Sequence, residues 1–242
     1  MQMRSQNLSE QLMNEIGQQI VGGELTSGDA LPPVELLSKQ MGVSRTVTRE
    51  AYKGLEARKL IGSQPKVGTT VRPVVEWQWW DIDVLRWALD GKPNRKVLRE
   101  LMEIRRAIEP AAVQLAAHNA TSEDIKAIQQ RFAQLQYAVG NVSEWVGADY
   151  EFHNCILLAS HNNLMVTLVQ TLRSALEYSR MATMSVLKNK PGRADHPPLQ
   201  VALERHKAVM DAILYRDGEL ARDRMQELLS MVSTLLDDAD EV

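Results

Sequence analysis

Asp149 and His153, in the segment DYEFH, are a pair of side chains whose types and spacing could bind a metal. Residues four apart lie on the same face of a helix, so the carboxylate and the imidazole would point the same way. Both side-chain types are ligands of divalent metals. Two ligands do not make a site, and this pair taken alone is more often an Asp–His hydrogen bond.

A second group of residues suits contact with nucleic acid. Ser44 is a good N-cap for a helix in the segment RTVTREAYKGLEARK, in which Val47, Ala51 and Leu55 fall on one side. The other side carries basic and hydroxyl groups from Arg45, Thr46, Arg49 and Lys53. Arg can contact the edge of guanine, and Lys and Thr can contact phosphates. The spacing fits a DNA-reading helix and an amphipathic helix with a solvated basic face equally well.

The neighbouring elements favour the first interpretation. An apolar repeat from Leu8 to Val21 predicts one helix, and the segment VELLSKQM after Pro32-Pro33 predicts a second, ending at Gly42. Downstream, Leu60-Ile61, a turn at residues 65–68 and the β-branched residues 69–71 predict a hairpin. Helices followed by a hairpin are typical of a winged helix-turn-helix, whose last helix reads a major groove.

Composition sets the fold class of the whole chain. Of 242 residues 44% are hydrophobic but only 5% aromatic, which favours a mainly α protein. The single cysteine, Cys155, excludes an intramolecular disulfide framework. Because no signal peptide or membrane-length apolar run is evident, we expect a cytoplasmic protein without a membrane partner.

The apolar pattern divides the chain into three predicted parts. They are a winged-helix DNA-binding domain over 1-72, a Trp-rich linker over 73-80, and a helical effector-binding and dimerisation domain over 81-242. Four of the five tryptophans lie within residues 77–87. We expect them to pin the linker and the following helix to the larger domain, in preference to forming a base-stacking platform.

The stretch LPPVELLSKQMGVSRTVTREAYKGLEARKLIGSQPKVGTTV resembles the GntR family of transcription regulators. The resemblance implies that Arg45, Thr46 and Arg49 contact a double-stranded DNA operator and that Gly68 approaches the minor groove. Glu35 and Val67 stand where the family often has Arg, which should weaken the salt-dependent part of binding. Lys39 and Lys66 would partly compensate.

Residues 97-235 are similar to the FCD effector-binding domain of one GntR subgroup, an all-helical antiparallel bundle. The motifs are RRAIEPAAVQLAA, DYEFHNCILLASHN and ERHKAVMDAILYRDGELARDRM. The resemblance implies a Zn, Ni or Mn site at Asp149, His153 and His206, with Leu228 at the position of a fourth His. Because Leu228 cannot coordinate, the two alternatives are a three-ligand site completed by water or effector oxygen and a site that has lost its metal. The resemblance also implies that Arg105 faces the carboxylate of an organic-acid effector, next to Asp149; the alternative for Arg105 is a surface ion pair with Glu109, four residues further on. Ser174 is a weaker effector-binding candidate, with helix packing as the alternative.

Together these features predict a homodimeric, ligand-responsive transcription regulator. Within the subgroup, the segment QWWDIDVLRW and the missing fourth His are most similar to repressors of sugar-acid operons of the galactonate type. A metal-sensing regulator is the alternative. A metal-dependent helical enzyme is less favoured, because no general base is evident beside the ligands and no standard nucleotide or hydrolase motif occurs. We therefore predict that the protein is not an enzyme.

Overall fold

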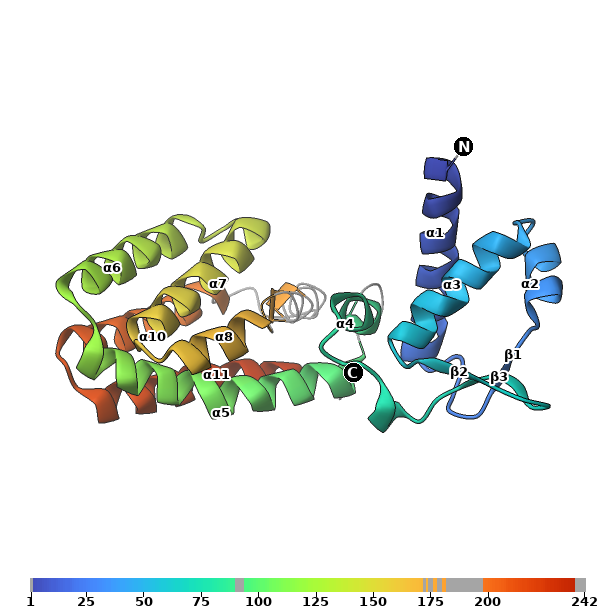
Figure 1. The fold of residues 1–242 in the computed structure, drawn as a ribbon. Helices are drawn as coiled ribbons and strands as arrows, with labels where there is room; N and C mark the ends of the chain where they lie inside the picture. Colours follow the sequence, from blue (N-terminus) through green and yellow to red (C-terminus); the bar gives the residue numbers. More distant parts are fainter. Residues whose placement is uncertain are drawn as a thin grey trace. The chain divides into compact units, whose positions relative to one another are not determined.

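The structure is a computed structural model that describes residues 2–89, 94–171, 173, 176, 177, 180, 181 and 198–237. The chain forms two compact units, Met1–Asn94 and Arg95–Val242. Both are mainly helical, as predicted, with one small sheet in the first unit (Figure 1). Each unit is described by itself below.

The first unit is the predicted winged helix-turn-helix. It contains α1 (Gln2–Val21), β1 (Ala30–Leu31), α2 (Val34–Gln40), α3 (Arg45–Ala57), β2 (Ile61–Gln64) and β3 (Gly68–Val71). The strands form an antiparallel sheet in the order β1-β3-β2, with Gly62 paired to Thr70. The hairpin was predicted, whereas β1 was not, because two residues are too short for an alternating pattern.

Local sequence explains how α3 and the wing form. The hydroxyl of Ser44 accepts a hydrogen bond from the backbone N–H of Val47 at 3.2 Å, so Ser44 is the predicted N-cap. Lys66 and Gly68 have φ angles of 68° and 94°, which place both in the left-handed region at the turn between β2 and β3. The cap and the turn therefore fix where α3 begins and where the wing reverses.

Trp77 and Trp87 pack against residues of the first unit, which the expectation of contacts with the larger domain did not include. After a 3₁₀ turn (Val74–Glu76), helix α4 (Ile82–Leu89) packs on α1. The indole N–H of Trp77 donates to the carbonyl of Arg72, and that of Trp87 donates to Asn14 Oδ1. A Cβ atom on Gly17 would lie 2.6 Å from the ring of Trp87, so glycine is required there. Helix α4, predicted to open the helical domain, is part of the first compact unit.

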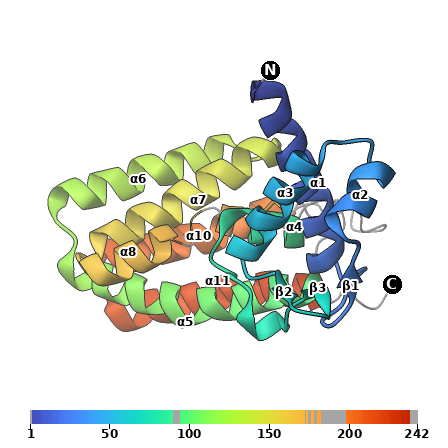
Figure 2. The ribbon, with the colours of Figure 1, turned by 45° about the vertical axis from the view of Figure 1, so that its right-hand side comes forward.

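The second unit is a bundle of helices. It contains α5 (Arg95–Asn119), α6 (Ser122–Tyr137), α7 (Val142–Ala159), α8 (Asn163–Thr171), α10 (Pro198–Leu214) and α11 (Gly218–Asp237). Helix α5 lies along α11 and also packs on α7, and α10 packs on α5, α6 and α11 (Figures 1 and 2). Trp145, Phe152 and Ile213 are each no more than 1% exposed, and they belong to one core to which α5, α6, α7, α10 and α11 all contribute. Within the described ranges, no helix is long and apolar enough to cross a membrane.

Candidate functional site

The three predicted metal ligands converge inside the helical unit. Asp149 and His153 come from α7 and His206 comes from α10, and one ligand atom of each lies within 4.8 Å of the others. His206 Nε2 is 2.9 Å from Asp149 Oδ1 and 3.2 Å from His153 Nε2, and the distance from His153 Nε2 to Asp149 Oδ1 is 3.8 Å. Ligand atoms bound to one ion at about 2.0–2.2 Å lie roughly 3–3.5 Å apart, so these spacings suit a shared metal.

The partners of the two imidazoles orient the rings for metal binding. His206 Nδ1 lies 2.6 Å from the carbonyl of Ala202, and His153 Nδ1 lies 2.7 Å from Glu109 Oε2. Both oxygens only accept, so a neutral ring carries its proton on Nδ1 and directs the Nε2 lone pair into the space that it shares with the Asp149 carboxylate, where an ion could be bound. The His153 contact is short but poorly aligned for a hydrogen bond. Burial lowers the pKa of His153, while the nearby Glu109 carboxylate raises it. Burial has the larger effect, so the neutral ring is favoured.

Two buried arginines complete the cluster. Arg105 Nε donates to Glu109 Oε1 at 2.7 Å, and Arg180 Nε donates to Asp149 Oδ2, with Arg180 Nη2 3.6 Å from Glu109 Oε1. Burial alone would raise the pKa values of both carboxyl groups. The neighbouring groups together have the larger effect. Arg105 lowers the pKa of Glu109, and Arg180 lowers that of Asp149, so both pKa values lie below their usual range. The cluster therefore contains two fixed positive and two fixed negative charges.

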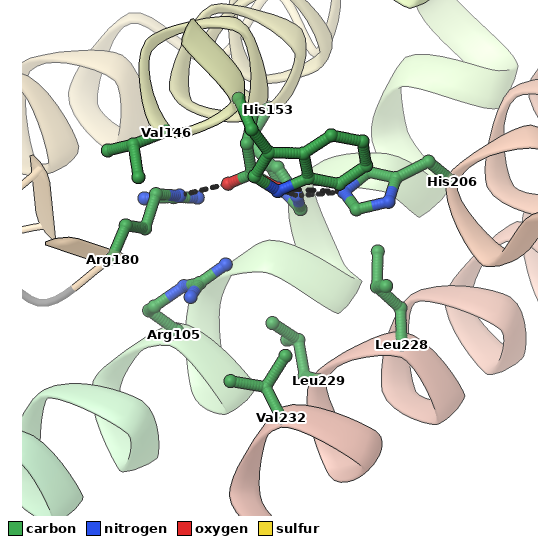
Figure 3. A pocket seen from close by; sticks show the side chains of 10 residues that line it. Arg105, Val146, His153, Arg180, His206, Leu228, Leu229 and Val232 are labelled. Atoms are coloured by element: carbon green, nitrogen blue, oxygen red, sulfur yellow. Dashed lines mark hydrogen bonds and ion pairs between the residues drawn. The ribbon is translucent and has the colours of Figure 1, made fainter. Parts of the chain in front are cut away.

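A cavity of about 390 Å³, counting its open mouth, adjoins this cluster. Figure 3 shows Arg105 and Arg180 on one side and apolar side chains of α11 on another. Leu228 stands where the family resemblance places a fourth His ligand. It is 2% exposed and lines the cavity beside His206. The cavity thus combines guanidinium, imidazole and carboxylate groups with an apolar wall formed by Trp145, Val146, Leu228, Leu229 and Val232.

The structure brings most of the predicted effector and metal residues together. Arg105, Asp149, His153 and His206 line one cavity, whereas Ser174 lies outside the described residues. The alternative interpretation of Arg105, a surface ion pair with Glu109, is wrong because the side chains are only 6% and 13% exposed. Sequence reasoning missed Arg180. No local spacing marks it, because its partners Glu109 and Asp149 lie on α5 and α7, far away in the sequence.

The predicted DNA-contacting residues of α3 share its exposed face. Val47, Thr48, Ala51, Tyr52 and Leu55 are buried, and Arg45, Thr46, Arg49 and Lys53 are exposed. Lys66 and Gly68 lie at the exposed tip of the wing. Glu35 is 3.9 Å from Arg45, and Lys53 is 2.9 Å from Glu50, but all four side chains are more than half exposed. Such surface pairs contribute little energy, so the basic groups remain available to phosphates.

Comparison with known proteins finds two family matches, one within each compact unit. Residues 8–71 match the bacterial regulatory proteins of the gntR family, and residues 100–231 match the FCD domain. The galactonate operon transcriptional repressor of Escherichia coli K12 is 28% identical over 228 residues, covering 94% of this chain and 95% of that protein.

Two further comparisons extend over nearly the whole chain. An HTH-type transcriptional regulator of Escherichia coli K12, YieP, is 29% identical over 227 residues, covering 92% of this chain and 93% of that protein. The solved structure of Lar, which controls expression of the Listeria monocytogenes agr system, has the same fold. Its TM-score is 0.62 at 17% identity, over 95% of this chain and 96% of that chain. The chain therefore belongs to the GntR family of bacterial transcription regulators, in the subgroup with an FCD domain.

Proposed function

We propose that this regulator represses an operon for the breakdown of a sugar acid or related organic acid, and that the acid releases it from its operator. The observation that carries the proposal is the cavity that adjoins two buried arginines and the Asp149–His153–His206 group. The likeness to the galactonate operon repressor supports a sugar acid and the repressing sign. The protein would act in the cytoplasm as a homodimer, with one winged helix on each half-site.

The chemistry of the cavity supports an anionic ligand. A carboxylate that enters a helical bundle loses its hydration, and a buried anion without a partner is too costly to persist. Arg105 is the residue that the family resemblance assigns to this carboxylate. Hydroxyl groups of the acid would find partners in Asp149 and the imidazoles, which offer both acceptors and donors.

We further propose that Asp149, His153 and His206 hold a divalent metal, Zn, Ni or Mn. The convergence of two Nε2 lone pairs and a carboxylate oxygen supports this, since these donors suit all three ions. The metal would supply a positive charge to which oxygen atoms of the acid bind. The apolar side chain of Leu228 leaves the remaining positions to water or to the acid.

Release from DNA would follow from unequal binding to two conformers. The cluster joins α5, α7, α10 and the segment that carries Arg180, so an acid bound there would favour one arrangement of these helices. A ligand shifts an equilibrium only by its difference in affinity between conformers, typically about 1–3 kcal/mol, which is roughly 5- to 150-fold in operator affinity.

The proposal is tested with the full chain and a labelled operator. We expect an aldonate such as galactonate to raise the melting temperature and to lower operator affinity, and Arg105→Met to abolish both effects. Arg106→Met is the matched control, because Arg106 is the adjacent, exposed residue of the same helix. Acids that leave both quantities unchanged in the parent protein would overturn the acid-responsive function.

Metal dependence is tested on the same protein. We expect near-stoichiometric metal after reconstitution, its loss in His206→Ala, and weaker binding of the acid in the presence of a chelator. If metal alone releases the operator without any acid, the regulator senses the metal. Protein that stays metal-free after reconstitution, with acid affinity indifferent to the chelator, would refute the metal site.

A further inference from the structure

An acidic side chain lies beside the basic groups that α3 exposes. Glu35 is in the first turn of α2, and its Oε1 lies 3.9 Å from Nη1 of Arg45, the first residue of α3. Both side chains are more than half exposed, so water reaches the pair in the free protein. A residue predicted to contact DNA therefore has an acidic neighbour that comes from a different helix.

The position of Glu35 relative to α3 is fixed by contacts of the backbone that carries it. Helices α2 and α3 pack on each other (Figures 1 and 2). The hydroxyl of Tyr52, on α3, donates to the carbonyl of Pro32 at 2.6 Å, two residues before α2 begins. The hydroxyl of Ser38, which is 6% exposed, donates to the backbone carbonyl of Glu35 at 3.0 Å. The side chain of Glu35 can turn about its own bonds, but its carboxylate stays in the neighbourhood of Arg45.

The other two cations on the exposed face of α3 differ in their partners. Lys53 Nζ lies 2.9 Å from Glu50 Oε1, three residues earlier on the same helix. Within the described ranges, Arg49 has no carboxylate partner. Arg49 is therefore the cation of this face whose charge is not compensated, whereas the charge of Arg45 is opposed by a residue outside α3.

Phosphate contacts and base contacts respond differently to a nearby carboxylate. A phosphate carries a full negative charge, whereas the O6 and N7 atoms of guanine carry only partial charges. Arg45 lies 3.9 Å from Glu35, and a phosphate oxygen bound to Arg45 would lie about 3 Å further on, so about 7 Å would separate the two anions. Glu35 therefore opposes a phosphate contact of Arg45 more strongly than it opposes a base contact.

We propose that Glu35 is a specificity-determining residue, which weakens binding to other DNA more than it weakens binding to the operator. Binding to a duplex without the operator sequence depends on phosphate contacts, which carry no sequence information. At the operator, Arg45 can contact a base edge instead. The ratio of the two affinities decides where a regulator resides on a genome, so a residue that raises this ratio serves repression. This role goes beyond the proposed function, because it involves neither the acid nor the metal.

The test compares the binding of the full chain to two DNA duplexes. One is the sequence that the parent protein enriches from a pool of random duplexes, and the other is a scrambled duplex of the same length and composition. Fluorescence anisotropy gives the affinity for each duplex at several salt concentrations. Glu35→Gln removes the charge and keeps the size of the side chain. Glu15→Gln is the matched control, because Glu15 is an exposed residue of α1 in the same unit.

We expect Glu35→Gln to bind the scrambled duplex roughly 2- to 10-fold more tightly, the effect of two like charges about 7 Å apart near a protein surface in the presence of salt. The enriched duplex should gain less, so the ratio of the two affinities should fall. The slope of log affinity against log salt should steepen by about one for the scrambled duplex, because one more phosphate is contacted. In an Arg45→Met background, Glu35→Gln should have a much smaller effect.

Several results would overturn this role. Equal gains for both duplexes, or a gain of the same size in Glu15→Gln, would mean that Glu35 acts only through the net charge of the protein. Unchanged affinity for the scrambled duplex would place Glu35 away from the phosphates. An undiminished effect in the Arg45→Met background would separate Glu35 from Arg45. No acid or metal is added, so this proposal and the proposed function can each fail while the other stands.

Discussion

Replacing Arg180 by Met should destabilise the helical unit strongly. Arg180 is 5% exposed and its partner Asp149 is 12% exposed, so water does not screen the pair. Removing one partner of a buried ion pair leaves the other charge uncompensated, which costs about 3–5 kcal/mol. Since about 1 kcal/mol shifts the melting temperature by roughly 2–4 °C in a protein of this size, Arg180→Met should melt about 6–20 °C lower.

A double-mutant cycle tests whether the lost charge pair is the cause. Asp149→Asn should also destabilise the protein. The double variant with both substitutions should lose much less unfolding free energy than the sum of the two single losses. Arg173→Met is the control, because Arg173 carries the same type of ion pair, to Glu177, yet is 54% exposed. Its effect should stay below about 1 kcal/mol. Additive effects in the cycle, or equal losses for Arg180 and Arg173, would refute the buried-pair reasoning.

Three further predictions concern DNA and pH. Arg49→Ala should weaken specific operator binding by about 1–3 kcal/mol without changing the melting temperature, and unchanged affinity in fluorescence anisotropy would remove Arg49 from the interface. Val67→Arg should tighten binding and steepen the slope of log affinity against log salt by about one, whereas an unchanged slope would place the wing away from phosphates. In the folded protein the pKa values of Glu109 and Asp149 lie below the ordinary values of 4.5 and 3.8 that the unfolded chain has. As the pH falls through these ordinary values, the unfolded chain therefore takes up protons that the folded protein does not yet bind. Stability should therefore be fully present above about pH 5 and be lost progressively on acidification, which urea unfolding at several pH values measures; a rise in stability below pH 4 would contradict it.

The DNA-binding unit was largely predictable because its signals are local. A cap at Ser44, an apolar face opposite a basic face on α3, and a turn at Gly68 each depend on a few neighbouring residues. The strand β1 was missed, since its two residues take their role from pairing with Thr69 and Thr70, far along the chain. The packing of Trp87 on α1 was missed for the same reason, because its site depends on Gly17.

From local spacing alone, the candidate site was predictable only where its residues lie on one helix, whereas Arg105 and His206 were identified through the family resemblance. Asp149 and His153 are four apart on α7, and their common face follows from helix geometry. The role of Arg180 arises from side chains on α5 and α7 that meet in three dimensions, which no local spacing indicates. Glu109 was recognised as a partner of Arg105, but its burial depends on the packing of α5 against α7 and α11.

The charges of the buried cluster link the proposed metal to the proposed acid. With neutral imidazoles, Arg105 and Arg180 balance Glu109 and Asp149, so the cluster has no surplus positive charge for an incoming carboxylate. An acid that binds alone would leave one uncompensated negative charge in a buried site. A divalent ion on Asp149 and the imidazoles would reverse that imbalance. The acid should therefore bind more tightly with metal present, and by thermodynamic reciprocity the metal should bind more tightly by the same factor with the acid present.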